Sequence, residues 1–289
     1  MIMAGKQQGK LYVVATPIGN LTEFTPRAIE ILQSVELIAC EDTRTSSVLL
    51  QRFNINTPLV ACHKFNETSV TEKLLNTIHG GSDVALVSDA GTPSISDPGV
   101  ILVAAAAAQG IEILPVTGAC AAIAALSVSG FSGLSFGFYG FLPKEKKKIN
   151  ELLERADGDS TPILIFYLSP HRLFETLRLI AARWQDAKLC LCNDMTKLHE
   201  YTYRGSPHTV LDAVENNPKA DRGEYVLVVE KPQLYIEPDD TSLSYEARLV
   251  DDIMHHGGTL KDSVARLAND GLSKNALYSA SVRLKKLLE

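Results

Sequence analysis

The sequence lacks the short motifs that mark several large enzyme classes. It contains no G-x-G-x-x-G, so the usual dinucleotide loop and the glycine loop of Rossmann methyltransferases are both missing. It also contains no G-x-x-x-x-G-K-[ST], which argues against hydrolysis of nucleoside triphosphates. Since H-E-x-x-H is absent too, the familiar metalloprotease function loses its support.

Cysteine is scarce, and long apolar runs are absent. The five cysteines are an odd number and contain no C-x-x-C pair, so we expect neither a disulfide framework nor a metal site. The longest apolar run, residues 100–108, has nine residues, whereas a membrane-spanning helix needs roughly 20. Residues 1–10 hold two lysines and no apolar stretch typical of a secretory signal, so we expect a cytoplasmic protein without a membrane contact.

Length and composition are those of an ordinary globular protein. The 289 residues favour about two domains, and a net charge of -6 argues against nonspecific coating of nucleic acid. Basic residues nevertheless cluster at residues 144–148 and in the tail, where residues 261–289 hold six Lys or Arg against three acids. Each cluster is compatible with a solvated helix face or with contacts to RNA phosphates.

Short apolar segments alternate with helical patterns from residue 11 onward, which is typical of an α/β protein. Strands are predicted at residues 11–16, 37–40, 84–88, 111–115, 162–168, 188–192 and 225–230, and helices at residues 26–34, 98–109, 120–129, 146–155, 171–183 and 207–216. Thr25, Asp97, Ser169 and Ser206 each precede a proline and are predicted to cap a helix N-terminus.

The pattern predicts three parts. Residues 1–130 form an N-terminal α/β domain, residues 131–235 a second α/β domain, and residues 245–289 a small C-terminal helical module. In the module, two helical segments flank a turn at Asp270-Gly271, a spacing that suits a nucleic-acid reader and equally any short helical hairpin.

Polar or small residues gather in four loops that follow predicted strands, where ligands bind in sheets of this class. Residues 16–21 form a Pro/Gly turn, and residues 41–44 place two carboxylates and a guanidinium together, either as a structural Asp–Arg clasp or as a substrate wall. Residues 88–99 are the strongest signal, because this loop is longer than a connection requires and contains the small residues Ala90 and Gly91. Residues 116–122 are also small, which permits close ligand approach or tight helix packing.

Together these segments resemble the ribosomal small-subunit RNA 2'-O-ribose methyltransferases of the tetrapyrrole methylase superfamily. The resemblance covers essentially the whole chain and rests on residues 14–21, 41–44, 89–93, 95–99, 166–167, 171–172, 195–197 and 222–224. It implies a two-domain tetrapyrrole-methylase-like architecture with S-adenosyl-L-methionine bound between the domains. It also implies a homodimer that methylates a cytidine ribose in the decoding region of small-subunit ribosomal RNA, free or in the assembled subunit.

The resemblance and the loop chemistry give a set of candidate site residues. We expect the cofactor cleft to be lined by Asp89, Ala90, Gly91, Thr92, Pro93, Gly118, Ala119 and Met195, with Tyr167 packed nearby. Met195 and Tyr167 are equally compatible with places in the core. Asp42 or Glu41 is expected to accept the hydroxyl proton, Arg44 to grip a phosphate, and Lys197 to stabilise the alkoxide or bind phosphate.

Three positions depart from the family pattern. Pro-Gly is usual where Thr117-Gly118 stands, Glu is usual at Leu168, and Arg-Glu is usual where Asn193-Asp194 stands. We expect Leu168 and Asn193 to face each other, so that an ion pair has been lost as a unit. Two other functions stay open: a non-catalytic RNA-binding protein of this fold, and a methylase of tetrapyrroles or another small molecule.

Overall fold

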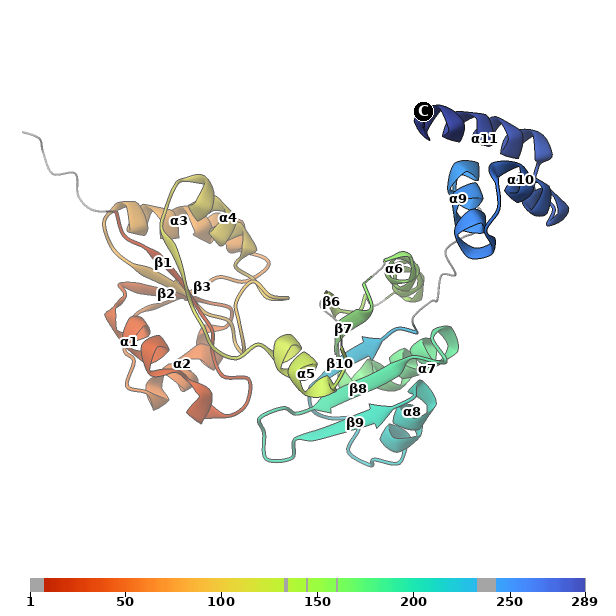
Figure 1. Ribbon diagram of the computed structural model, residues 1–289. Helices are drawn as coiled ribbons and strands as arrows, with labels where there is room; N and C mark the ends of the chain where they lie inside the picture. The colour runs from red at the N-terminus through yellow and green to blue at the C-terminus, as the bar shows by residue number, and fades with distance from the viewer. Residues whose placement is uncertain (1–7, 133–134, 144, 160, 233–242, 289) are drawn as a thin grey trace, which may run out of the picture. The chain divides into compact units, whose positions relative to one another are not determined.

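The computed structural model describes residues 8–132, 135–143, 145–159, 161–232 and 243–288 (Figure 1). Its contacts divide the chain into two compact units, Met1–Pro232 and Gln233–Glu289. The first unit contains two five-stranded sheets with helices packed on them. The α/β class is therefore confirmed.

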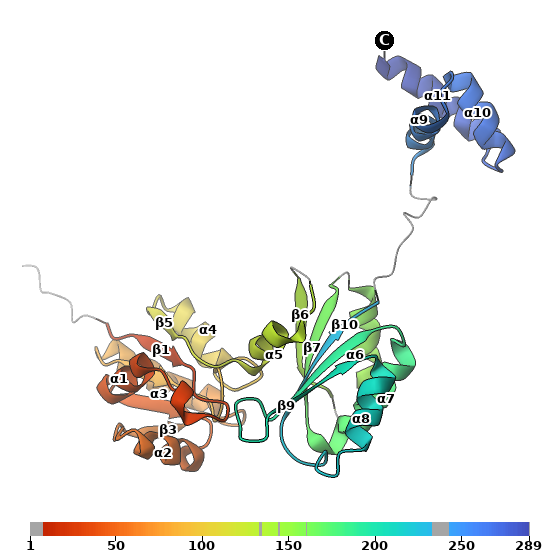
Figure 2. The ribbon, with the colours of Figure 1, turned by 60° about the horizontal axis from the view of Figure 1, so that its bottom comes forward.

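The first sheet is parallel, with strand order β3-β2-β4-β1-β5. Its strands are β1 (Leu11–Val14), β2 (Leu37–Cys40), β3 (Leu59–Ala61), β4 (Val84–Leu86) and β5 (Ile113–Val116). Its helices are α1 (Pro26–Ser34), α2 (Thr43–Arg52), α3 (Glu67–His79) and α4 (Val100–Ala108), with the short 3-10 helix η1 (Leu21–Glu23) after β1. One buried cluster joins the sheet to α1 and α2, and another joins it to α3 and α4, so helices cover both faces (Figure 2). Because all five strands run the same way, the loops after β1, β2 and β4 meet at one edge.

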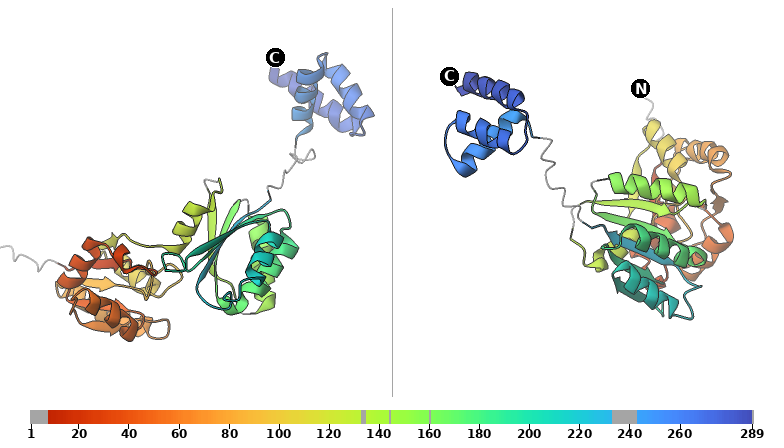
Figure 3. Two further views of the ribbon diagram at one scale, coloured as in Figure 1. Left: turned by 90° about the horizontal axis from the view of Figure 1, so that it is seen from below. Right: turned by 90° about the vertical axis from the view of Figure 1, so that its right-hand side faces the viewer.

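The second sheet is mixed, with strand order β6-β7-β10-β8-β9. Its strands are β6 (Phe136–Phe141), β7 (Ile163–Leu168), β8 (Lys188–Asn193), β9 (Tyr201–Gly205) and β10 (Tyr225–Glu230). Its helices are α5 (Ala121–Ser129), α6 (Lys146–Gly158), α7 (Leu173–Arg183) and α8 (Pro207–Glu215), with the 3-10 helix η2 (Pro170–Arg172). A large core joins α6, α7 and α8 to one face, and α5 packs on the other (Figure 3). Helix α5 thus precedes the join that we predict at residue 130 but covers the second sheet.

The predicted strands and helices are present with small shifts at their ends, and the sequence reading missed α2, α3, β3, β6 and β9. Two predicted caps are confirmed, because Thr25 accepts a hydrogen bond from the amide of Ala28 and Ser206 from the amide of Thr209, each at 3.2 Å. Ser169 precedes η2 and makes no capping bond through its side chain.

The prediction that Asp97 caps the following helix is wrong. Helix α4 begins at Val100, and Gly99 occupies the capping position with a φ of 121°, where a side chain would be strained. The free amides are instead capped by a carboxylate from another helix. Glu67 of α3 is buried, and its Oε1 accepts hydrogen bonds from the amides of Gly99, Ile101 and Leu102 at 3.0, 2.7 and 3.4 Å. A negative charge is favoured there, since the first amides of a helix have no partner within it.

The expectation that Leu168 and Asn193 face each other is also wrong. Both residues pair with Tyr225, Leu168 from β7 and Asn193 from β8, on opposite sides of β10. Two strand spacings place them about 9.6 Å apart, beyond the reach of about 8 Å for cross-strand neighbours. Leu168 lies in the buried core, and Asn193 donates a hydrogen bond to the carbonyl of Glu224 at 3.5 Å.

The second unit contains helices α9 (Tyr245–His256), α10 (Leu260–Asn269) and α11 (Lys274–Leu288), so the predicted helical hairpin is present. Leu249, Leu277 and other apolar residues form its core, and Arg266 pairs with the buried Asp252 at 2.7 Å. Of the basic cluster at 144–148, Lys144 lies outside the described residues. In the part of the chain that the structure describes, every helix is too short or too polar to cross a membrane.

Replacing Glu67 with Gln should lower the free energy of unfolding by about 1–3 kcal/mol, because the charge that receives the α4 amides is lost in a buried place. Urea unfolding measures the effect. Glu72→Gln is the matched control, since Glu72 lies on the exposed face of the same helix. Equal stability of the two variants would contradict a capping role for Glu67.

Candidate active site

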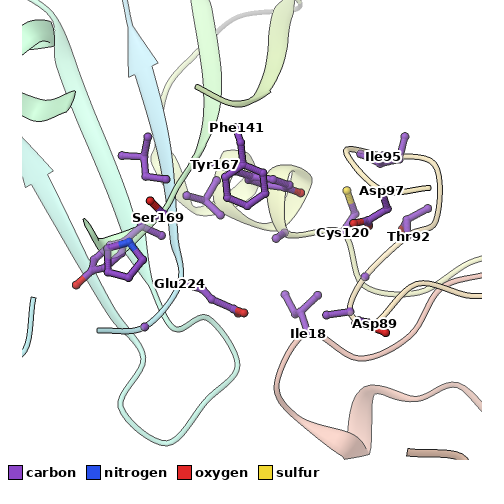
Figure 4. Close-up of a pocket in the computed structure, with 18 residues that line it drawn as sticks. Ile18, Asp89, Thr92, Ile95, Asp97, Cys120, Phe141, Tyr167, Ser169 and Glu224 are labelled. Carbon is purple, nitrogen blue, oxygen red and sulfur yellow. The ribbon is translucent and has the colours of Figure 1, made fainter. Parts of the chain in front are cut away.

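A cavity of about 390 Å³ lies at the edge where the β1 and β4 loops of the first sheet meet the second sheet (Figure 4). The first sheet contributes Ile18, Asp89, Ala90, Gly91, Thr92, Ile95 and Asp97. The other lining residues are Cys120, Ala121, Phe141, Tyr167, Leu168, Ser169, Pro170, Gly223, Glu224, Tyr225 and Val226. The cavity is thus walled by segments from both halves of the first unit.

The 88–99 loop is fixed against the β1 end by its backbone. The amides of Thr16 and Gly91 each donate to the other residue's carbonyl, at 2.9 and 3.1 Å, and the Thr92 hydroxyl donates to the carbonyl of Ala119 at 2.9 Å. Gly91 has a φ of 86°, and a Cβ built there would lie 3.4 Å from the side chain of Ile18. Glycine at position 91 therefore allows the positive φ of the turn and leaves the space beside Ile18 open.

Aromatic side chains form the opposite wall. Tyr167 contacts Phe138 and Phe141 edge to face, with ring centroids 5.0 and 5.4 Å apart. The amide of Ala122 donates to the Tyr167 hydroxyl at 3.3 Å. Burial raises the pKa of Tyr167 to about 12, so the ring stays neutral at physiological pH. These rings give the cavity an apolar wall.

Three carboxyl groups at the first-sheet edge repel one another. Burial, followed by the charges of Glu41 and Asp89, raises the pKa of Asp97 to about 6. Burial also raises the pKa of Glu41 and of Asp89, with like-charged neighbours adding to the shift. A cation bound in the cavity would reverse this effect, because opposite charge stabilises a carboxylate.

The predicted catalytic residues after β2 lie outside the cavity lining. Asp42 caps α2 and binds Arg44 through two hydrogen bonds, at 3.1 and 2.7 Å. These bonds lower the pKa of Asp42 to about 2, so this carboxylate is a weak proton acceptor. The amide of Asp42 also donates to Asp89 at 3.3 Å, which ties the two loops together. The structural Asp–Arg clasp is therefore present.

Lys197 is held between two acids. Its Nζ lies 2.8 Å from Asp194 Oδ1 and 3.0 Å from Glu224 Oε2. Burial lowers the pKa of Lys197, but the hydrogen bonds to Asp194 and Glu224 outweigh it, so the pKa is raised overall. The ammonium group therefore stays charged at the end of β8, beside the cavity-lining Glu224.

Five of the predicted cofactor residues, Asp89, Ala90, Gly91, Thr92 and Tyr167, line the cavity, and Pro93, Gly118, Ala119 and Met195 do not. A Cβ on Gly118 would lie 2.9 Å from that of Ala15, so this glycine allows close packing of β1 and β5. Met195 is buried in the core beneath α5. The cofactor roles of all nine stay predictions.

Sequence reading did not assign Asp97, Phe141 or Glu224 to the cavity. Phe141 was missed because it ends β6, a strand that the glycine-rich pattern concealed. Glu224 was missed because it stands before β10, whereas only the loops after strands were searched. In an antiparallel pairing the start of one strand lies beside the end of its neighbour, and sequence alone does not give that pairing. Among the described residues, no group of three or more His, Cys, Asp or Glu is placed to hold a metal.

Comparisons with known proteins agree with this architecture. The profile of the family Tetrapyrrole (Corrin/Porphyrin) Methylases matches residues 10–210. The crystal structure of uroporphyrin-III C-methyltransferase from Thermus thermophilus in complex with S-adenosylhomocysteine is similar in fold, with a TM-score of 0.52 and 16% identity over 76% of this chain and 97% of that one.

Two full-length relatives are each called ribosomal RNA small subunit methyltransferase I. The protein from Synechocystis sp. is 41% identical over 283 residues, which cover 96% of this chain and 99% of the relative. The protein from Escherichia coli O157:H7 is 41% identical over 278 residues, or 95% of each chain. The chain belongs to the tetrapyrrole methylase family and, within it, to the family of ribosomal RNA small subunit methyltransferase I. The expected resemblance is confirmed.

Replacing Asp97 with Asn should stabilise the protein by about 1–2 kcal/mol at pH 8, a value discounted for partial exposure of the group. The sign follows from its pKa of about 6, which lies above the usual unfolded value of about 3.9. Ionisation of Asp97 therefore costs stability as the pH rises through this window.

Urea unfolding at pH 8 and pH 4 tests this expectation, with exposed Asp186→Asn as the control. The gain of the Asp97 variant should shrink to about 0.5 kcal/mol or less at pH 4, where the wild-type carboxyl is protonated in the folded state and about half protonated in the unfolded state. A gain that is equal at both pH values, or a loss at pH 8, would refute the assignment.

Proposed function

We propose that the protein is an S-adenosylmethionine-dependent methyltransferase that methylates the 2'-hydroxyl of a cytidine in the decoding region of small-subunit ribosomal RNA. The observation that carries the proposal is the near full-length similarity to proteins named ribosomal RNA small subunit methyltransferase I. The two-walled cavity supplies a place for the cofactor at the edge where this class of sheet binds ligands.

The cavity residues suit the methyl donor, whose bound form supplies an electrophilic methyl group on a positively charged sulfur. Asp89 and Asp97 offer negative charge, and Ala90 and Gly91 allow the ligand to approach the backbone. Tyr167 and Phe141 offer an apolar wall. The S-adenosylhomocysteine complex of the uroporphyrin-III C-methyltransferase of this fold supports the same ligand class.

Methyl transfer to a ribose hydroxyl needs an acceptor for the hydroxyl proton, and such an acceptor contributes roughly 100- to 10,000-fold to rate. Of the two acceptors that the sequence predicts, Glu41 suits the role better than Asp42, because its pKa is raised whereas that of Asp42 is about 2. Lys197 is positioned to stabilise negative charge. Arg44, with 89% of its side chain exposed, is free to meet a phosphate on its outer side.

We also propose that the protein acts in the cytoplasm as a homodimer, on ribosomal RNA or on the assembled small subunit. Helices α4 and α5 expose the large apolar side chains of Val100, Ile101, Ile123 and Val128, which supports contact with a second copy. A sedimentation-equilibrium mass of one chain at micromolar concentration would contradict the dimer.

Incubation with tritiated S-adenosylmethionine and assembled small subunits tests the activity. We expect label in a dinucleotide that resists alkaline hydrolysis, because a 2'-O-methyl group blocks attack by the ribose oxygen on the phosphate. Cofactor binding without transfer would favour the non-catalytic RNA-binding function, and transfer to a tetrapyrrole would favour the small-molecule methylase.

Gly91→Ala should weaken binding of S-adenosylhomocysteine at least tenfold, because the added methyl group points toward Ile18 at the cavity wall. Gly110→Ala is the matched control: its φ of 70° is also positive, but a Cβ there meets nothing within 4 Å. Isothermal titration calorimetry measures both. Equal affinities for the two variants would place the cofactor elsewhere.

A further inference from the structure

A second cavity, of about 420 Å³, adjoins the first. The two cavities share Ile18, Asp89, Ala90 and Glu224 in their linings. The remaining lining residues come from the loop and 3-10 helix after β1 (Pro17, Gly19 and Leu21), from α2 (Thr45, Val48, Leu49 and Arg52) and from Lys197. We call it the α2 hollow.

The α2 hollow combines an apolar surface with two cations. Leu21 and Val48 are 39% and 72% exposed, although both are aliphatic. Arg52, in the last turn of α2, makes no ion pair with any residue that the structure describes, and Lys197 is held in place by Asp194 and Glu224. An apolar wall beside a free guanidinium matches the chemistry of a nucleotide, which presents a flat base and an anionic phosphate.

We propose that the α2 hollow binds the acceptor nucleotide of a single-stranded RNA segment, with the base against Leu21 and Val48, the phosphate at Arg52, and the ribose at the shared wall. This inference rests on the proposed function and specifies where its substrate lies. The shared lining is the main argument, since transfer needs the acceptor oxygen about 3–3.5 Å from the methyl carbon. Only an acceptor site that opens onto the cofactor cavity meets this requirement.

Glu41 suits the role of acceptor better than Asp42 but lines neither cavity, whereas Asp89 lies in both. The geometry therefore assigns the ribose proton to Asp89 rather than to Glu41. In the transfer a bond forms between the 2'-oxygen and the methyl carbon while the carbon–sulfur bond breaks and leaves its electron pair on sulfur. The proton of the hydroxyl passes to the Asp89 carboxylate. Burial, which raises the pKa of Asp89, makes this carboxylate a stronger base.

Two pairs of variants test the hollow with small subunits as substrate. Val48→Trp fills it, whereas Gln51→Trp adds the same ring at an exposed position of α2 outside the lining. Arg52→Gln removes the proposed phosphate contact, and Arg27→Gln removes a cation from the exposed surface of α1. The readouts are KM for the subunit, its dependence on salt, and the affinity for S-adenosylhomocysteine.

We expect Val48→Trp and Arg52→Gln to raise KM for the subunit about tenfold and to leave S-adenosylhomocysteine affinity within twofold. Arg52→Gln should also reduce the slope of log affinity against log salt by about 1, as loss of one phosphate contact does. Gln51→Trp and Arg27→Gln should change neither quantity. Asp89→Asn, measured with saturating cofactor, should lower kcat about 100-fold or more.

Wild-type activity with unchanged KM and salt slope in Val48→Trp and Arg52→Gln would overturn the hollow as the acceptor site while leaving the proposed function in place. Absence of transfer by the wild-type protein, despite cofactor binding, would contradict both. Because cofactor affinity is measured on every variant, misfolding of a variant is recognised directly.

Discussion

The 88–99 loop is anchored at both ends, and the arrangement of the site depends on this double anchoring. At its start, two backbone hydrogen bonds join Gly91 to Thr16 at the end of β1. At its end, the buried carboxylate of Glu67 holds the first amides of α4. A loop of this length would otherwise pay a large conformational entropy to stay in one shape. The anchored loop thus forms the wall of the cavity on the side of the first sheet.

The 88–99 loop and the neighbouring Glu41 concentrate negative charge, which has no ion-pair partner among the residues that the structure describes. Asp89, Asp97 and Glu41 are partly buried, and repulsion among them adds to the cost of desolvation. By contrast, Asp42 has its own guanidinium partner in Arg44. A cationic ligand stabilises the carboxylates of Asp89 and Asp97 more than that of Asp42, whose charge Arg44 already balances. This difference favours a sulfonium in the cavity. Stability is thereby traded for ligand affinity at this edge, as is common in functional sites.

Local signals in the sequence predicted much of the fold. Thr25-Pro26 and Ser206-Pro207 gave two helix starts through capping chemistry that needs no tertiary context. Asp97-Pro98 has the same pattern of a capping residue before proline, but the prediction from it was wrong, because Glu67, distant in sequence, caps α4 instead. Similarly, Leu168 and Asn193 both end strands, but the strand that separates them, β10, follows much later in the chain. The capping of α4 by Glu67 and the place of β10 between β7 and β8 both depend on tertiary structure, so the local sequence pattern could not predict either.

The candidate site divides in the same way. Asp89, Ala90, Gly91 and Thr92 were correctly predicted to lie together at a cavity, because a long loop after a parallel strand indicates a ligand-binding site. Glu224 and the α2 hollow were missed because they arise where segments from different parts of the chain meet. The central claim is that the methyl donor occupies the cavity between the 88–99 loop and the Tyr167 wall. A crystal structure with S-adenosylhomocysteine tests it most directly: we expect the sulfur beside Asp89 and facing the α2 hollow, and ligand density at any other surface of the protein would contradict it.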